Sequence, residues 1–191
     1  MSKLHIIVVS TRQGRQGLAV GEWFAGFAAR HGGFDIEIVD LAAMDLPLLD
    51  EPAHPRLQQY EFAHTRAWSA KVSEADAFVF VTPEYNYGSP PSLVNALDYL
   101  VQEWAYKPCG FVSYGGISGG TRSVQMTKQI VTTLKMMPMQ EAVTIPFFTQ
   151  FVNDAGAFVP TELHERAGAD MLDELRRWTE AMQSLRAPAA G

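Results

Sequence analysis

The sequence predicts one doubly wound α/β domain, in which five parallel strands form a sheet with helices on both faces. Short apolar runs alternate along the chain with longer segments whose apolar residues recur at helical spacing. The chain has 191 residues, close to the size of one ordinary domain. Apolar residues make up 47% of it, so a core can be built and disorder throughout is excluded. We expect this domain to cover residues 1–186 and a disordered tail to follow at residues 187–191.

The first half of the chain contains two predicted strands and two predicted helices. Leu4 to Ser10 is a short apolar run rich in β-branched residues and predicts a buried strand. Leu18 to His31 has a helical apolar stripe that ends at a glycine pair. Phe34 to Val39 alternates in polarity, which predicts an outer or edge strand. The proline-containing segment from Leu41 to Pro55 predicts a surface loop, and a helix is expected over about Tyr60 to Ser73.

The second half continues the alternation. Ala77 to Thr82 is a continuous apolar run that ends before Pro83, which predicts a central strand followed by a loop. The remaining elements are a helix that opens at Ser89-Pro90-Pro91-Ser92, a buried strand at Cys109–Ser113, a helix at Thr121–Met136, a strand at Gln140–Ile145 and a closing helix at Thr161–Leu185.

Charge and composition exclude several classes of partner. The formal net charge is −6, from 15 basic and 21 acidic residues, which argues against nucleic acid as a partner. No run of eighteen apolar residues occurs, so we expect no membrane-spanning helix. The single cysteine, Cys109, cannot form an intramolecular disulfide, and the first apolar run is too short for a secretory signal. We therefore expect a cytoplasmic protein.

Three loops are the expected site of function. In open parallel sheets, ligands bind outside the carboxyl ends of the strands, near the point where the strand order reverses. The loops that follow the first, third and fourth predicted strands stand out for their glycine, hydroxyl, amide and aromatic residues. They are Ser10–Gly17, Pro83–Ser89 and Ser113–Gly120.

The first loop suits an anion. Ser10, Thr11, Arg12 and Arg15 lie between a strand and a helix N-terminus, and Gly17 permits unusual backbone geometry. The pattern matches neither the triphosphate-binding loop nor the dinucleotide fingerprint, so a single phosphate fits better. The alternative is an ordinary strand-to-helix turn with solvated arginines.

The second and third loops suit a flat ligand. Glu84, Tyr85 and Asn86 offer polar groups and aromatic surface, as recognition of a planar heterocycle requires. The third loop has four glycines in eight residues, so its backbone can lie against a ring. Each loop alone could be a simple turn. Together they describe a site for a phosphate, a linker and an aromatic ring, which is the shape of flavin mononucleotide (FMN).

Three motifs resemble those of the NADPH-dependent FMN reductases of the flavodoxin-like superfamily. The segment from Thr82 to Leu100, TPEYNYGSPPSLVNALDYL, is similar to that family's TPEYN and NALD pattern. The first loop keeps the family's Ser10 and Arg12 positions but has Arg15 and Gly17 where Ser and Asn are usual. The third loop resembles the family's SxGxxGG pattern. The resemblance extends from about Leu4 to Ile145.

The resemblance implies a flavodoxin-like fold, bound FMN and an enzyme that takes hydride from NADPH or NADH. Electrons would pass to a small acceptor such as a free flavin, a quinone, an azo compound or a metal oxyanion. No side chain need act as acid or base, because the flavin carries the chemistry. The family also implies a homodimer or homotetramer, for which Tyr99 and Trp104 could supply partner contacts or simply pack in the core. The implied FMN ligands are Ser10, Thr11, Arg12, Arg15, Gly17, Pro83, Glu84, Tyr85, Asn86, Ser113, Tyr114, Gly115 and Gly116.

Two other functions fit parts of the sequence. Gly116 to Gly120 matches GxSxG between a strand and a helix, which would make Ser118 a hydrolase nucleophile with Asp154 and His164. A flavodoxin-like electron carrier without NADPH turnover is the other alternative. No metal site is expected, because the five histidines form no close pair at ligand spacing and Cys109 starts a strand.

Overall fold

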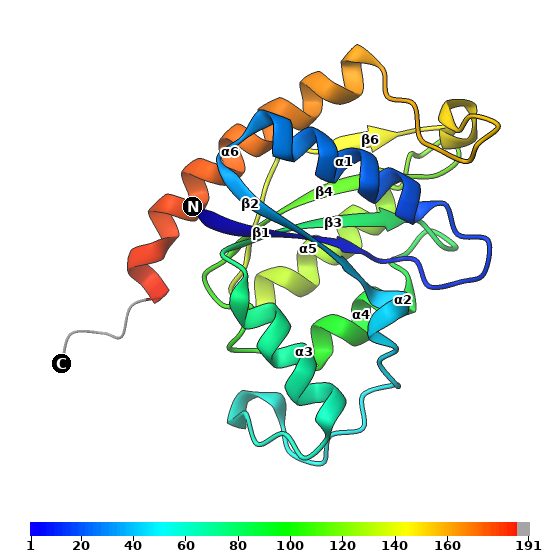
Figure 1. Cartoon of the computed structure of the whole chain (residues 1–191). Helices are drawn as coiled ribbons and strands as arrows, with labels where there is room; N and C mark the ends of the chain where they lie inside the picture. Colours follow the sequence, from blue (N-terminus) through cyan, green and yellow to red (C-terminus); the bar gives the residue numbers. More distant parts are fainter. Residues whose placement is uncertain (187–191) are drawn as a thin grey trace.

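The computed structural model describes residues 1–186, and the expected tail at residues 187–191 lies outside the described residues. The described strands form one parallel sheet in the order β2-β1-β3-β4-β5, with β6 also paired to β4 (Figure 1). This confirms the predicted α/β fold with a parallel sheet. The strands are β1 (Ser2–Val8), β2 (Phe34–Asp40), β3 (Ala77–Pro83), β4 (Pro108–Tyr114), β5 (Met137–Pro138) and β6 (Val143–Ile145).

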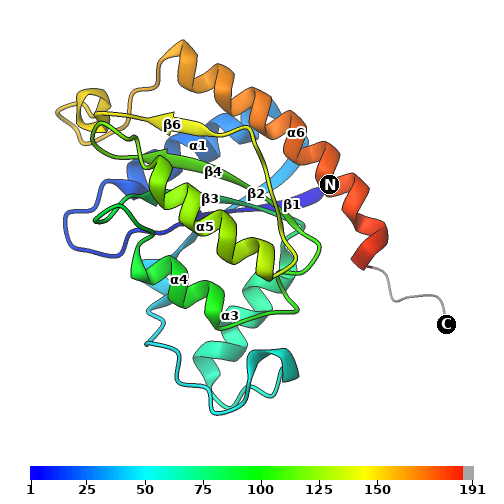
Figure 2. The same cartoon turned by 180° about the vertical axis from the view of Figure 1, so that it is seen from behind.

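Helices cover both faces of the sheet. In Figure 1, α1 (Gly17–His31) and α6 (Glu162–Arg186) lie above it, and α3 (Ala63–Glu74), α4 (Pro91–Asp98) and α5 (Thr121–Thr133) lie below it. Figure 2 shows the same two layers from behind. Since successive strand side chains point to opposite faces, each strand contributes to two apolar cores.

The two cores hold different side chains. On the α1 and α6 side, Phe24 and Met171 pack with strand residues such as Ile6. On the other side, Trp68 and Trp104 pack with the aromatic residues of β3 and β4. Both faces of the central strands are therefore dry, as expected for a parallel sheet between two helical layers.

The fifth strand differs from the prediction. A continuous strand was expected over Gln140–Ile145, but β5 ends at Pro138 and β6 begins at Val143. Proline has no N–H to donate to a ladder, and this strand lies at the edge of the sheet, where such an interruption is tolerated. Met139 N still donates to Cys109 O at 2.8 Å, so the two short strands lie along one neighbour, β4.

Other boundaries moved by a few residues. The predicted edge strand is confirmed as β2, although it reaches Asp40. The Asp40 side chain accepts from Ala42 N and caps a short helix, α2 (Leu41–Met44), in the segment predicted as loop. Two 3₁₀ turns, at Pro55–Leu57 and Phe148–Phe151, were also missed because each is a single turn without a periodic pattern.

Helix α4 positions two aromatic residues that follow it. Tyr99 and Trp104 are fully buried, so they serve the core and the suggested partner contact is wrong for both. Tyr99 donates its hydroxyl to Pro47 O at 3.1 Å, and Trp104 Nε1 donates to Leu97 O at 3.2 Å. Among the helices of residues 1–186, none is sufficiently long and apolar to cross a lipid bilayer.

The topology brings the three glycine-containing loops to one edge. Strands β1, β3 and β4 are neighbours, and all three point the same way. The strand order reverses at this point: β2 is added on one side of β1, and β3 and the later strands are added on the other side. A crevice is expected between β1 and β3, because the loops after these strands run to opposite faces of the sheet. A candidate site should therefore lie at the carboxyl ends of β1, β3 and β4.

Candidate functional site

A pocket of about 650 Å³ lies at this carboxyl edge. This volume is within the range of small-molecule and cofactor sites. Its walls come from the loops after β1, β3 and β4, with further residues from the start of α4 and from the segment after β6. The lining residues are Ser10, Arg12, Arg15, Gln16, Pro83, Glu84, Tyr85, Asn86, Pro91, Tyr114, Gly115, Gly116 and Phe148.

Arg15, in the first loop, is held by an ion pair. Its guanidinium contacts both carboxylate oxygens of Asp40 at 2.5 Å and donates to Ser10 O at 2.8 Å. Both side chains are about four-fifths buried. The hydrogen bonds from Arg15 hold the pKa of Asp40 below its usual value, although burial opposes this. Arg15 therefore fastens the first loop to the end of β2.

Arg12 differs from Arg15 because it is exposed and lines the pocket. Within residues 1–186 its guanidinium has no ion-pair partner. Ser10 lies beside it, 1% exposed, and its Oγ has no hydrogen-bond partner in the structure. A free guanidinium and an unpaired hydroxyl beside the start of α1 form a suitable anion site. Of the two arginines predicted for the phosphate, Arg12 has a guanidinium that the described residues leave free to bind an anion, whereas that of Arg15 is already paired with Asp40.

Gly17 lies behind the pocket wall. A Cβ at this position would lie 2.3 Å from Ser10 Oγ and 2.5 Å from the Tyr114 hydroxyl. Only glycine lets α1 start this close to both side chains. Burial raises the pKa of Tyr114 to about 12, so its hydroxyl stays protonated and able to donate near neutral pH.

The second loop forms a two-residue hairpin turn. Tyr85 and Gly88 exchange backbone hydrogen bonds of 3.1 and 2.9 Å. The residues between them, Asn86 and Tyr87, both have positive φ angles of 49° and 71°. Positive φ at both central positions is the pattern of a type I′ turn. The turn places Tyr85 and Asn86 on the pocket wall, and the Tyr85 hydroxyl is buried without a partner.

The carboxylate of Glu84 contacts protein groups on the third loop and at the start of α5. It accepts from Ser118 Oγ at 2.9 Å, from Arg122 N at 3.1 Å and from Arg122 Nε at 2.6 Å. Burial opposes ionisation of Glu84, but these hydrogen bonds outweigh it and lower its pKa below the usual value. Glu84 therefore lines the pocket, but its carboxylate is already paired with Arg122.

The third loop contributes backbone to the pocket. Tyr114, Gly115 and Gly116 line it, and a Cβ at Gly116 would meet nothing within 4 Å. A flat ligand can therefore approach the Gly116 backbone without a side chain between them. Ser113 is fully buried on β4, and its Oγ has no hydrogen-bond partner.

The structure gathers ten of the thirteen predicted FMN ligands around one pocket. The other three are adjacent: Thr11 lines a neighbouring pocket with Asn95, Gly17 supports the wall, and Ser113 is buried beneath it. Sequence reasoning missed Gln16, Pro91 and Phe148. Gln16 and Pro91 lie inside or beside motifs that were recognised, whereas Phe148 follows β6 and carried no signal.

The hydrolase arrangement is not present. Ser118 Oγ donates to Glu84, and His164 Nδ1 accepts from Thr161 N at 3.1 Å at the start of α6. The His164 ring packs against Phe151 and Phe158. A triad requires the serine hydroxyl to donate to the histidine ring, so these contacts contradict the alternative built on Ser118.

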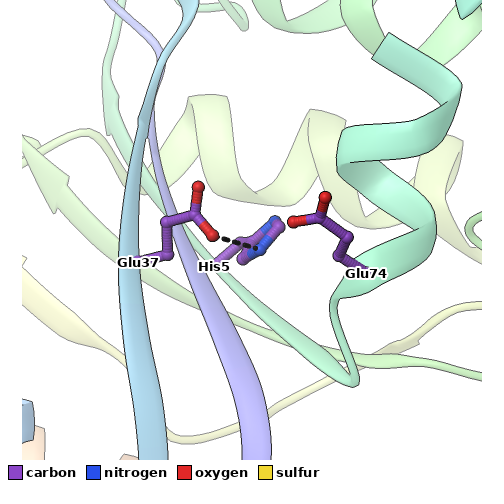
Figure 3. A group of neighbouring side chains, drawn as sticks. All are labelled: His5, Glu37 and Glu74. Carbon is purple, nitrogen blue, oxygen red and sulfur yellow. Dashed lines mark ion pairs between the residues drawn. The ribbon is translucent and has the colours of Figure 1, made fainter. Parts of the chain in front are cut away.

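A second cluster of ionisable side chains lies away from this pocket. His5 on β1, Glu37 on β2 and Glu74 at the end of α3 converge, as Figure 3 shows. No sequence motif predicts this group, because its members meet only through the fold. Lys71 Nζ lies 2.8 Å from Glu37 and 3.1 Å from Glu74, and Lys3 is close to both. The two lysines already balance both carboxylates, so the cluster is best described as an ion-pair network.

Comparison with known proteins identifies the family of this chain. The family model described as NADPH-dependent FMN reductase matches residues 2–150. The chain belongs to this family. It is 42% identical over 148 residues to an NAD(P)H-dependent FMN reductase of Schizosaccharomyces pombe, covering 75% of this chain and 74% of that protein. It is 30% identical over 160 residues to an NADPH:quinone oxidoreductase of Arabidopsis thaliana, covering 81% and 74% of the two chains.

The fold has similar solved structures. The flavoenzyme FerB of Paracoccus denitrificans, an NAD(P)H:(acceptor) oxidoreductase, superposes with a TM-score of 0.75. The alignment covers 95% of this chain and 98% of FerB at 18% identity. This likeness confirms the flavodoxin-like architecture. As a member of the FMN reductase family, the protein is an oxidoreductase that uses FMN and NAD(P)H.

Proposed function

We propose that this FMN reductase family member holds FMN in the pocket at the carboxyl ends of β1, β3 and β4 and transfers electrons from NAD(P)H to small acceptors. The observation that carries the proposal is the convergence of three loops on one pocket of about 650 Å³. One loop offers cationic and hydroxyl groups, and the other two offer aromatic, amide and glycine surface. This division fits a molecule with a phosphate at one end and a flat ring at the other.

The residues present fit FMN chemically. Three hydroxyl groups at or beneath the pocket, on Ser10, Tyr85 and Ser113, are buried without hydrogen-bond partners. Buried polar atoms are normally paired, so unpaired hydroxyls beside a pocket are suitable partners for a polar ligand. We assign Arg12, Ser10 and the first backbone N–H groups of α1 to the phosphate.

We assign the second and third loops to the ring end. Tyr85 and Asn86 form one wall, and the backbone of Gly115 and Gly116 forms the other. When bound, FMN would supply the hydride-accepting and electron-donating chemistry. Backbone N–H groups of the third loop would place positive ends of dipoles near the ring, where negative charge gathers on reduction. The protonated Tyr114 hydroxyl, which lies beside Ser10 and Gly17, would face the phosphate end.

The chain's own residues need perform no proton transfer. Glu84 is the carboxylate on the pocket wall, and its low pKa and its bonds to Arg122 and Ser118 leave it without a proton to donate. Phe148 covers one side of the pocket and packs edge-on to Tyr114 at 5.1 Å between ring centroids. Its role is to exclude water from the ring end.

The acceptor and the assembly are part of the proposal. The name of the Arabidopsis thaliana relative favours a quinone as one acceptor. Exposed apolar side chains on the loops around the pocket, Tyr87, Ile117 and Phe147, support a homodimer or homotetramer with the pocket near the interface. We place the protein in the cytoplasm, because its single cysteine fits a reducing compartment.

The proposal is tested by adding FMN to flavin-free protein and following quenching of flavin fluorescence and the rise in melting temperature. Saturable quenching with a higher melting temperature is expected, because a ligand that binds only the folded state stabilises it. Riboflavin, which lacks the phosphate, is the matched control and should bind more weakly. No quenching and no melting shift at large excess would overturn the assignment.

Turnover is tested with the flavin-loaded protein. Oxidation of NADPH and NADH should be accelerated by a quinone, and free FMN and an azo dye are the comparison acceptors. If the flavin binds but neither nucleotide reduces it, the protein is an electron carrier instead. Light scattering with and without FMN reports the size of the assembly.

A further inference from the structure

The pocket-forming turn in the second loop has an unusual backbone. Type I′ turns favour Asn followed by Gly, because both central residues need positive φ. Here the second central residue is Tyr87, with φ of 71°. A bulky residue in this region is strained unless its surroundings hold it there. Tyr87 is also 72% exposed, so core packing does not hold it.

Arg122 supplies the missing restraint. Its guanidinium lies over the Tyr87 ring, 3.8 Å from the ring centroid, in cation–π geometry. The same guanidinium is also held by Glu84, whose carboxylate lies 2.5 Å from Nη2 and 2.6 Å from Nε. Glu84 immediately precedes the turn, and Arg122 lies in the first turn of α5. The three side chains therefore join the second loop to the start of α5, which follows the third loop.

The burial of these groups suits the role. The Glu84 side chain is 7% exposed and the Arg122 side chain 44% exposed. The carboxylate also accepts from Ser118 Oγ and from the Arg122 backbone N–H, so its position is fixed by several donors. A buried, multiply bonded carboxylate is a firm anchor for an arginine fork.

We propose that Arg122 is a positioning residue for the flavin, because its contacts with Glu84 and Tyr87 hold the turn from Tyr85 to Gly88 in the conformation that presents Asn86 to the pocket. This inference rests on the proposed function. It assigns to Glu84 a role through Arg122 instead of direct contact with the cofactor. It also explains why a tyrosine is tolerated where the turn prefers glycine.

A rescue experiment tests the inference. Arg122→Ala should weaken FMN binding about fivefold, the upper end of what a solvent-exposed guanidinium–ring contact contributes. Adding Tyr87→Gly to that variant should restore the affinity to within about twofold of the unchanged protein, since Asn-Gly adopts the turn without help. Arg122→Lys keeps the charge but not the fork, and should resemble Arg122→Ala. Arg177→Ala, which breaks a solvent-exposed arginine–glutamate pair on α6, is the matched control.

The outcomes separate this role from direct contact and from general damage. If Tyr87→Gly does not restore the FMN affinity of Arg122→Ala, Arg122 touches the ligand itself. If Arg122→Ala binds FMN as well as the unchanged protein, Arg122 has no role in binding. Either result overturns the inference. Hydrogen exchange at the Gly88 amide, which donates to Tyr85 O, provides a readout without flavin. In flavin-free protein its protection should fall in Arg122→Ala and return in the double variant. This result holds even if the pocket proves to bind something other than FMN.

Discussion

The two arginines of the first loop should respond differently to removal. Arg12→Ala should weaken FMN binding and leave the fold unchanged, whereas Arg15→Ala should weaken the fold. The reason is their pairing: Arg15 contacts both oxygens of Asp40 and donates to Ser10 O, whereas Arg12 is exposed beside the pocket. The sequence placed both residues among the expected FMN ligands, Arg12 at the family's usual position and Arg15 where the family usually has Ser.

The magnitudes follow from these contacts. Losing Arg15 leaves Asp40, about four-fifths buried, without its charged partner, so the free energy of unfolding should fall by about 2 kcal/mol. Losing exposed Arg12 should change it by less than about 0.5 kcal/mol. If Arg12 binds the phosphate, its loss removes a charge-assisted hydrogen bond of about 1.5–3 kcal/mol, or roughly a 10- to 100-fold increase in the FMN dissociation constant.

Urea denaturation of flavin-free protein and fluorescence titration with FMN measure the two effects separately. Arg166→Ala, an exposed arginine on α6, serves as the control for loss of one positive charge. The reasoning is refuted if Arg15→Ala leaves stability unchanged but abolishes FMN binding. That result would mean that Arg15 leaves Asp40 to bind the phosphate.

Three further predictions concern residues around the pocket. Asp40→Asn should lower the free energy of unfolding at neutral pH. Because folding lowers the pKa of Asp40 from 3.8, the difference between the variant and the unchanged protein should persist above pH 3.8 and disappear only as the pH falls through the folded-state pKa. A difference that stays constant in denaturation experiments down to pH 2 would contradict this. Gly17→Ala should lower the free energy of unfolding by about 1–3 kcal/mol, because its Cβ would overlap Ser10 Oγ and the Tyr114 hydroxyl, and an unchanged melting curve would disprove that clash. Ser118→Ala should keep NADPH-dependent reductase activity and lose only one hydrogen bond to Glu84, so a collapse of ester hydrolysis in that variant would revive the hydrolase alternative.

The sheet and its functional edge could be predicted because they depend on local patterns. Continuous apolar runs such as Ala77–Thr82 mark central strands, and the edge position of β2 follows from its mixed polarity. The break between Pro138 and Val143 was harder to foresee. It depends on how one edge strand meets β4, and periodicity does not report that.

Site membership was predictable where a motif carried it, but the partners of the charged groups were not. Arg15 meets Asp40 across 25 positions of sequence, and Glu84 meets Arg122 across 38. His5, Glu37 and Glu74 likewise converge only because β1, β2 and α3 are packed together. Sequence spacing shows which residues carry charge near a loop, but only the fold shows which charges are already satisfied.

The central claim is that the pocket between the three loops holds FMN and passes electrons through it. The most direct measurement is the visible absorbance of the FMN-loaded protein under anaerobic conditions as NADPH and then a quinone are added. We predict that the yellow absorbance bleaches with NADPH and returns with the quinone, and that Arg12→Ala needs more FMN to reach the same loading. A flavin that remains free in solution, or one that binds equally well to Arg12→Ala and to the unchanged protein, would contradict the account.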